Sequence, residues 1–421
     1  MNKTEINIMF STSNLENTLN ILCSIQKIKT LKKDKDFSLA ITVFDKTHEQ
    51  NILNHAKRYN LNISVVNASS ISELENKYAD FFYTANCSLK VDSIQRARIQ
   101  QQVFIIDNYK VLKNSIIWQV DDDILFGRSN YINSKHIVSY LLNYFSEIVQ
   151  FYDNNRSIDA IIAPTSYVPP IPSLLYSKTQ LEDYLNREYI RKEPVDSLEY
   201  HDYYNQPNDE KSYSLFLSET KDKIEIIRSI LMGKPITKVT CSEEGINEPK
   251  AQRSKLLRGG NFIVFNIDIF KIPHLGFCES DSIPARRSDM IHSQLLIELG
   301  FNIVDVNYFS LVHNRRFTNT TIEISAKKYF SDMIGALLIQ YLYKGENEFN
   351  NRLKFHQNHI KKIVKLLCDN VDESIFRNEI DRLKELDIQI NSFDKEHFIN
   401  AFEDFRLNKN QLILKLCKLA S

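Results

Sequence analysis

Short apolar runs alternate with helical patterns over the first third of the chain. Apolar residues dominate positions 6–10, 37–44 and 63–67, and each run is bounded by polar or turn-forming residues, which predicts three strands. Between these runs, residues 15–28 and 48–59 repeat apolar positions at helical spacing. Strands separated by helices in this way predict βαβ units, and therefore an α/β fold with a mainly parallel sheet and flanking helices.

A further helix and strand lead directly into three adjacent carboxylates. Residues 91–107 have a helical pattern, residues 115–120 form an apolar, β-rich run, and Asp121, Asp122 and Asp123 follow at once. Because open α/β folds bind ligands at the carboxyl ends of their strands, this run is expected at the functional edge of the sheet. Asp121 and Asp123 share one face of an extended chain, and their hard oxygen ligands suit Mg²⁺ or Mn²⁺. The alternative is an acidic cluster that caps the following turn.

The chain changes character after a predicted strand at 159–164. Residues 166–256 contain a Pro-rich stretch and a Tyr-rich loop, with one helix expected at 218–232, and we interpret them as an insertion. Strand, helix and strand patterns then return at 261–266, 289–299 and 302–306. Beyond about residue 325 the apolar stripes are helical, which predicts a C-terminal all-α region that serves packing or homo-oligomerisation.

Composition narrows the function. The 421 residues include 53 Lys and Arg against 53 Asp and Glu, so the chain lacks the basic excess of a general nucleic-acid binder. Its 9 glycines form neither G-x-G-x-x-G nor G-x-x-x-x-G-K-[ST], which argues against a glycine-cradled dinucleotide and a P-loop ATPase. A metal and arginines would then have to hold any phosphates. The candidate arginines are Arg98, Arg258, Arg287, Arg315 and Arg316.

The cysteines and the N-terminal residues indicate a compartment. The 6 cysteines include no C-x-x-C pair, and the start, MNKTEINIMF, lacks a basic region followed by a long apolar one. The sequence has no run of roughly 18 apolar residues, so no transmembrane helix is expected. We therefore predict a reduced, cytoplasmic protein, with which peripheral membrane contact is still compatible.

Several landmarks follow one another in order along residues 5–316. They are IMFSTSN after the first strand, AITVFD at the end of the second, SIQRARIQQQ with Arg96 and Arg98, WQVDDD with a D-x-D motif, LRGGNFIVFNIDIF, RRSDMIHSQLLIELG and NIVDVNYFSLVHNRR. In this order they resemble the nucleotide-sugar glycosyltransferases of the GT-A fold, most closely the large family 2 group of mainly inverting enzymes. One position departs from that family, because Ser288-Asp289 stands where it usually has Glu-Asp.

The resemblance implies a GT-A-like, Rossmann-like fold and a set of site residues. Asp121, Asp123 and His313 would bind the metal, Mn²⁺ or Mg²⁺, and Asp289 would be the general base on an acceptor hydroxyl. The residues expected to bind the nucleotide sugar are Ser11, Thr12, Asn14, Asp45, Arg98, Asp122, Gly260 and Arg315. The donor would be a nucleoside-diphosphate sugar, most often a UDP-sugar. The acceptor would be a glycan, a lipid or a small molecule, with transfer by inversion.

The resemblance also divides the chain. Residues 1–165 would be the nucleotide-sugar-binding half of the GT-A domain, and residues 257–324 its second half. Residues 166–256 would be a lid or acceptor region inserted between the two halves, and residues 325–421 a C-terminal helical domain.

Alternatives stay open for single residues and for the whole chain. Residues 11–14 equally fit a helix cap, and Asp289 fits a simple N-cap for which Ser288 competes. A nucleotidyltransferase also uses an α/β sheet and a carboxylate-bound metal, although residues 11–14 offer no glycine-rich, basic loop for a triphosphate. A non-catalytic sugar- or nucleotide-binding protein on the same scaffold is the third interpretation.

Overall fold

The computed structural model contains a central sheet of eight strands. It describes residues 4–31, 37–82, 94–132, 135–140, 143–163, 165–167, 173–185, 210–214, 221–233, 238–242, 251–252, 260–275, 277–280, 283–306, 308–314 and 321–419. The central strands are β1 (Thr4–Thr12), β2 (Phe37–Asp45), β3 (Ile63–Val66), β4 (Ile116–Val120), β8 (Ala160–Ile162), β12 (Ala251–Gln252), β13 (Asn261–Val264) and β16 (Ile303–Val306). Their order across the sheet is β12-β16-β8-β13-β4-β1-β2-β3.

The sheet is mixed and mainly parallel. Strand β1 pairs in parallel with β2 and β4, β2 pairs in parallel with β3, and β8 pairs in parallel with β16. Strand β13 runs antiparallel to both of its neighbours, β4 and β8, and β12 runs antiparallel to β16. The predicted α/β fold class with a mainly parallel sheet is confirmed.

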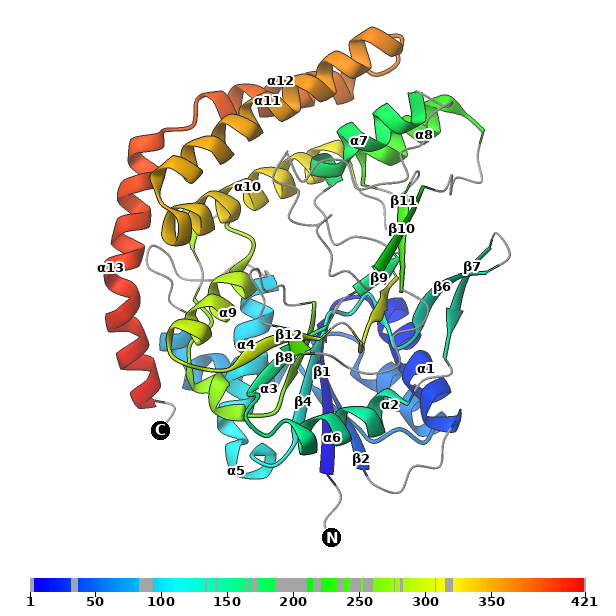
Figure 1. Ribbon diagram of the computed structural model, residues 1–421, viewed down its shortest axis with the longest axis vertical. Coiled ribbons are helices and arrows are strands. Elements are labelled where there is room, and N and C mark those ends of the chain that lie inside the picture. Colours follow the sequence, from blue (N-terminus) through cyan, green and yellow to red (C-terminus); the bar gives the residue numbers. More distant parts are fainter. Residues whose placement is uncertain are drawn as a thin grey trace.

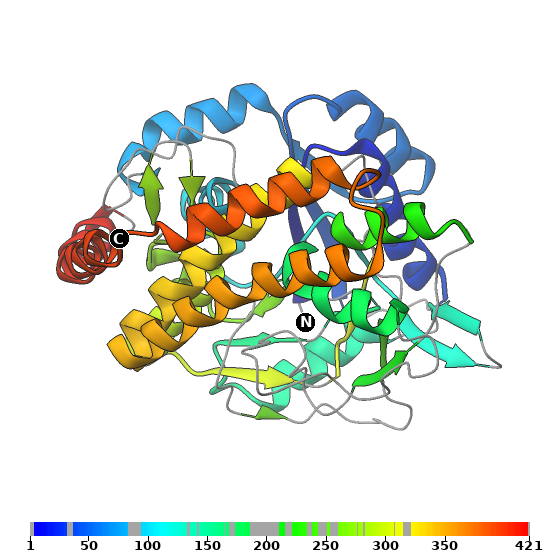
Figure 2. The same cartoon turned by 90° about the horizontal axis from the view of Figure 1, so that it is seen from above.

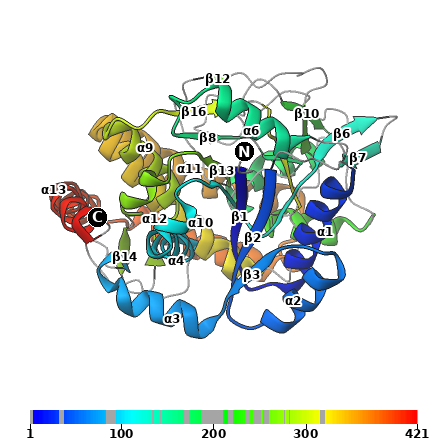
Figure 3. The same cartoon turned by 90° about the horizontal axis from the view of Figure 1, so that it is seen from below.

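Both faces of the sheet are covered, which explains why the strands are continuous apolar runs. The flanking helices are α1 (Leu15–Leu31), α2 (Glu49–Arg58), α3 (Ala68–Lys77), α4 (Ile94–Asp107), α5 (Tyr109–Leu112), α6 (Tyr144–Asn154) and α9 (Ser288–Glu298). In β1, Ile8 packs into the core that contains α1 and α6, whereas its neighbour Met9 packs into the core that contains α4 and α9. Figure 3 shows these helices around the strands, with α1 and α2 on the side opposite α13.

A second sheet of five short strands crosses the carboxyl end of the first. Its order is β10 (Glu210–Ser214), β11 (Lys238–Ser242), β9 (Thr165–Tyr167), β17 (Leu311–His313) and β5 (Ile124–Leu125). The described residues also form two hairpins, β6 (Arg128–Ile132) with β7 (Lys135–Ser139) and β14 (Cys278–Ser280) with β15 (Ile283–Pro284), and 3-10 helices at Ala79–Phe82 and Ile267–Lys271. Most strands of the second sheet and of the two hairpins are three to five residues long.

The C-terminal all-α region is confirmed, and it shares its core with two earlier helices. Its helices are α10 (Ile322–Lys344), α11 (Glu346–Asn370), α12 (Arg377–Asn391) and α13 (Lys395–Leu419). Helices α7 (Ser173–Leu185) and α8 (Lys223–Leu231), from within 166–256, contribute Leu175 and Ile227 to the same cluster as Leu337 of α10. Figures 1 and 2 show α10, α11 and α12, with α7 and α8, as a helical layer above the carboxyl ends of the central strands, whereas α13 runs down the side of the molecule. The described parts of 166–256 thus belong to this layer, to the second sheet and, through β12, to the edge of the central sheet.

The predicted helix at 218–232 begins later than expected. Residues 218–220 lie outside the described residues, and α8 starts at Lys223 because the Asp222 carboxylate accepts a hydrogen bond from the Ile224 N–H (2.9 Å) as its N-cap. In the part of the chain that the structure describes, no helix combines the length and apolar character needed to cross a bilayer.

Candidate active site

A pocket of about 240 Å³ lies where the carboxyl ends of β1 and β4 meet α4 and α10. Its polar lining consists of Ser11, Arg98, Gln101, Asp121, Asp122, Asp123, Arg286, His313 and Lys328. Three carboxylates therefore share one small space with an imidazole and three cationic side chains. Parallel strands β1 and β4 end together at this edge, which is where an open α/β sheet offers a binding site.

Strand pairing brings His313 to the acidic run. Strand β5, which begins directly after Asp123, pairs antiparallel with β17, and in this register His313 lies opposite Ile124. The Asn314 N–H donates to the Asp123 carbonyl oxygen (2.7 Å), and His313 Nε2 lies 3.1 Å from Asp123 Oδ2. The His313 side chain is only 5% exposed, so its orientation toward Asp123 is enforced by packing.

Asp121 faces the pocket and is paired with Arg98. Arg98 Nη2 donates to Asp121 Oδ1 at 2.5 Å, and the Asp121 side chain remains 40% exposed toward the pocket whereas Arg98 is 8% exposed. Gly260 leaves room for this carboxylate, since a Cβ there would lie 3.3 Å from Asp121 Oδ2. Desolvation outweighs the Arg98 charge, and with the Asp123 charge it raises the pKa of Asp121 to about 6.

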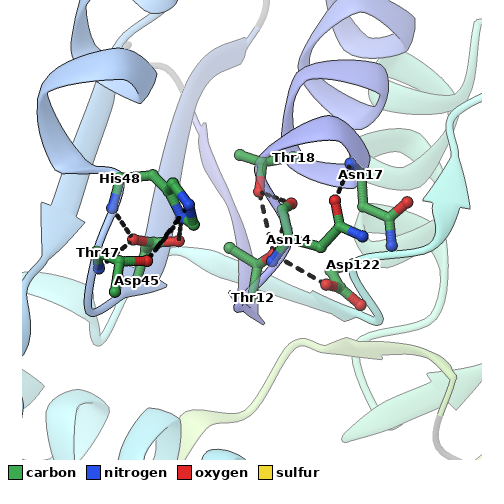
Figure 4. Close-up of polar contacts among 8 residues, drawn as sticks. All are labelled: Thr12, Asn14, Asn17, Thr18, Asp45, Thr47, His48 and Asp122. Carbon is green, nitrogen blue, oxygen red and sulfur yellow. Dashed lines mark hydrogen bonds and ion pairs between the residues drawn. The ribbon is translucent and has the colours of Figure 1, made fainter. Parts of the chain in front are cut away.

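Asp122 points toward the first strand. The Thr12 hydroxyl donates to Asp122 Oδ2 (2.9 Å), which connects the ends of β1 and β4 (Figure 4). Burial, aided by the Asp123 charge, raises the pKa of Asp122 to about 6 despite this hydrogen bond. Burial and the neighbouring Asp123 charge thus both disfavour ionisation of Asp121 and Asp122.

Ser11 is held in the pocket by a chain of amides. Gln101 Nε2 donates to Ser11 Oγ (2.9 Å), and Gln119 Nε2 donates to Gln101 Oε1 (2.8 Å). Both glutamines are buried, so the Ser11 hydroxyl has one defined hydrogen-bond donor and can itself donate to a ligand.

Asn14 and Asp45 are engaged in turns (Figure 4). Asn14 Oδ1 accepts from the Asn17 N–H (3.2 Å) in the first turn of α1, so Asn14 serves as the helix cap that the sequence left open. Asp45 Oδ1 accepts from the Thr47 N–H at 2.7 Å, Oδ2 lies 3.1 Å from His48 Nδ1, and Asp45 is 0% exposed. Neither residue lines the pocket, and nucleotide binding by them stays a prediction.

The cations of the pocket differ from those expected. Arg287 does not line it, because its guanidinium is 4% exposed and bonds to the buried Asp332, with Nη2 to Oδ2 at 3.0 Å. Arg258, Arg315 and Arg316 lie outside the described residues. Instead Arg286, next to the expected arginine, and Lys328 of α10 contribute to the lining. The two arginines directly before α9 could have pointed to Arg286 as a residue of the site, whereas no pattern in the sequence distinguishes Lys328 from the other lysines.

Asp289 lies in the first turn of α9, beside the pocket and not among its lining residues. It is half-buried, and its charge contributes to the raised pKa of Asp121. The helix begins at Ser288 with Arg287 in the N-cap position, so neither Ser288 nor Asp289 stands at the N-cap. Its predicted role as general base remains a prediction.

The side chains of Asp121, Asp123 and His313 meet only some of the requirements of a divalent metal site. Among the described residues, no group of three His, Cys, Asp or Glu side chains is already arranged to hold a metal ion. Asp123 and His313 nevertheless converge at 3.1 Å, and Asp121 faces the same pocket. Carboxylate oxygens with one imidazole nitrogen suit Mn²⁺ better than Mg²⁺. Asp121 would have to exchange its bond with Arg98 for one with the metal.

Comparisons with known proteins find distant similarity. A scan of protein-family models and a search of curated proteins each find no match to this chain. Among solved structures it is similar to glucosyl-3-phosphoglycerate synthase from Mycobacterium tuberculosis in complex with Mn²⁺, uridine diphosphate and phosphoglyceric acid. The identity is 11%, the TM-score 0.35, and 80% of this chain and 78% of that chain are covered. For mouse xyloside xylosyltransferase 1 the identity is 9%, the TM-score 0.25, and the coverage 46% and 63%.

Two histidines behind the pocket predict acid sensitivity. His292 of α9 is 4% exposed and stacks on His274 with ring centroids 4.3 Å apart, and its Nε2 lies 3.1 Å from the Ile272 carbonyl oxygen. Desolvation by burial lowers the pKa of His292 to about 4 from 6.5. The unfolded chain therefore binds a proton in this window that the folded chain does not, so the free energy of unfolding falls as the pH drops from about 6.5 to about 4.

We expect His292 to lower the free energy of unfolding by about 3 kcal/mol near pH 4 relative to pH 7, since one unit of pKa shift corresponds to about 1.4 kcal/mol. In denaturant titrations across this range, His292→Gln, which can keep the hydrogen bond to Ile272, should show a flatter pH dependence than the wild type. His397→Gln, at an exposed position of α13, is the matched control and should leave the slope unchanged. Parallel slopes for His292→Gln and the wild type would contradict the assignment.

Proposed function

We propose that the protein is a metal-dependent glycosyltransferase that moves a sugar from a nucleoside-diphosphate sugar to an acceptor hydroxyl, with inversion. One observation carries the proposal: Asp121, Asp123 and His313 meet Arg286 and Lys328 in a single pocket at the carboxyl edge of the sheet. Such a site offers carboxylates and an imidazole to a cation and cationic side chains to an anion. A diphosphate that leaves with its negative charge needs both.

The residues divide the work by charge. Asp121, Asp123 and His313 would hold the Mn²⁺ or Mg²⁺ ion, which supplies charge neutralisation for the leaving diphosphate. Arg286 and Lys328 would neutralise the remaining phosphate charge, and Arg98 would join them once Asp121 exchanges its bond with Arg98 for one with the metal. Ser11, Thr12 and Asp122 line or border the place where a nucleoside would enter. A UDP-sugar, as the resemblance implies, is the first donor to test.

Asp289 would take the proton from the acceptor hydroxyl. A general base must be ionised and near the reacting atoms, and Asp289 lies in the first turn of α9, where the helix dipole favours a negative charge. A direct displacement of the diphosphate by the activated hydroxyl inverts the anomeric centre.

Incubation with Mn²⁺ and a panel of nucleotide sugars tests the proposal. Release of nucleoside diphosphate is expected with at least one donor and is expected to stop on addition of EDTA. Release of pyrophosphate from a nucleoside triphosphate would instead indicate a nucleotidyltransferase. Absence of turnover with every donor, together with absence of UDP or GDP binding by calorimetry, would overturn the proposal.

A further inference from the structure

Helix α10 of the C-terminal region touches the backbone of Arg286. A Cβ on Gly335 would overlap the Arg286 carbonyl oxygen and lie 2.8 Å from the Arg286 carbonyl carbon. The Arg286 N–H also donates to the Ser331 carbonyl oxygen of α10 (3.1 Å). A glycine in a helix interior is costly by about 0.5 to 1 kcal/mol, so its presence here is explained by this close approach.

The next residue is attached to the same helix by a buried ion pair. Arg287 Nε and Nη2 donate to Asp332 Oδ1 and Oδ2 at 3.3 and 3.0 Å, and the two side chains are 4% and 2% exposed. Arg287 has a φ of +72°, in the left-handed region that a residue with a side chain adopts only when its surroundings impose it. The ion pair and the Gly335 contact supply that constraint.

These contacts determine where two functional groups point. The Arg286 side chain lines the pocket, and α9, which carries Asp289 in its first turn, begins directly after Arg287. Lys328, two helical turns before Gly335 on α10, lines the same pocket. The helical region predicted to serve only packing or oligomerisation therefore borders the site itself.

We propose that Gly335 and Asp332 are positioning residues, which hold the 286–287 segment against α10 so that the Arg286 guanidinium enters the pocket. This inference rests on the proposed function, in which Arg286 meets the anionic part of the donor. Helix α10 is then an integral part of the active site. If α10 only packed, substitutions at Gly335 would change stability and leave the kinetics of the folded protein intact.

The first test is Gly335→Ala. Ala in a helix interior normally stabilises relative to Gly by about 1 kcal/mol, but here it must displace the Arg286 backbone. A misplacement of about 1 Å in an active site can cost up to about 10²-fold in rate, so we expect kcat to fall by about 10- to 100-fold. Gly345→Ala is the matched control. Gly345 has a φ of +86° and no atom within 4 Å of its Cβ position, so this change should lower the melting temperature and leave kcat and KM unchanged.

A double-mutant cycle separates positioning from packing. If Gly335 acts through Arg286, then Gly335→Ala should cost less than about threefold in kcat in an Arg286→Ala background. If the reductions in kcat caused by Gly335→Ala and Arg286→Ala multiply in the double variant, the proposal is overturned. Unchanged kinetics of folded Gly335→Ala would overturn it too. Absence of turnover by the wild type would instead be the failure of the proposed function.

A second variant guards against misfolding of Gly335→Ala. Arg287→Met combined with Asp332→Leu removes both buried charges together, which proteins commonly tolerate, and removes the attachment to α10. We expect a folded protein with kcat reduced by about tenfold, again only where Arg286 is present. Unchanged kcat in this variant would contradict the positioning role of Asp332.

Discussion

Replacement of Asp289 by asparagine is expected to lower kcat by about 10²- to 10⁴-fold, the usual range for loss of a general base. The asparagine side chain has nearly the size and shape of the aspartate side chain, but its neutral amide cannot take the proton from the acceptor hydroxyl. Nucleotide binding should survive, because Asp289 does not line the pocket that the carboxylates and cations form. Steady-state kinetics with saturating donor and acceptor, together with calorimetric titration of the nucleotide, measure the two effects separately.

The control lies on the same helix. Glu298→Gln changes an exposed carboxylate in the last turn of α9 and should leave both kcat and nucleotide affinity at the wild-type level. If Asp289→Asn retains full turnover, another group takes the proton and the base assignment is wrong. If the wild type binds nucleotide and turns over nothing, the protein is a binding protein on a transferase scaffold.

The double replacement Asp121→Asn with Asp123→Asn should remove metal-dependent activity by about 10³-fold or more. A bound metal contributes several kcal/mol of charge stabilisation to a phosphoryl leaving group, and about 4 kcal/mol corresponds to that factor. Nucleotide affinity in the presence of Mn²⁺ should fall to the value that the wild type shows in EDTA. Calorimetric titration with UDP, with and without Mn²⁺, checks this.

The folding of this variant provides an internal check. Arg98 is buried and bonds to Asp121, so the loss of this partner should lower the free energy of unfolding, and denaturant titration checks that the double variant is folded under assay conditions. Asp153→Asn, at an exposed carboxylate paired with Arg156, is the control and should leave metal dependence intact. Equal nucleotide affinity of wild type and double variant would indicate that the acidic run merely caps its turn.

Periodicity predicted β1, β2 and β4 because most of their residues are buried. The runs at 6–10, 37–44 and 115–120 overlap these three strands, and the acidic run emerges at their common carboxyl edge. His313 could be associated with that run through the order of landmarks alone. A strand leading to His313 was expected, but its pairing with the two-residue strand β5, which brings His313 to 3.1 Å from Asp123, could not be read from the sequence.

Single polar residues were harder to assign, because their role depends on partners distant in the sequence. Asp45 stands at the end of a strand much as Asp121 does, yet its carboxylate accepts hydrogen bonds from the backbone N–H groups of Thr47 and His48 in the following turn. Arg287 and Arg286 are adjacent and chemically alike, but a left-handed backbone turn directs one to Asp332 and the other to the pocket. Gly335, one glycine within a helical stripe, shows its purpose only through contact with a segment 49 positions earlier.

The most direct test is a crystal structure of the protein with Mn²⁺ and UDP, with the anomalous signal of manganese used to locate the ion. We expect one manganese peak in the pocket, ligated by Asp123 and His313 and by Asp121 released from Arg98, with the diphosphate between this ion and Arg286. A manganese ion or a nucleotide bound elsewhere, or a pocket in which Asp121 keeps its bond to Arg98 and no metal is present, would contradict it.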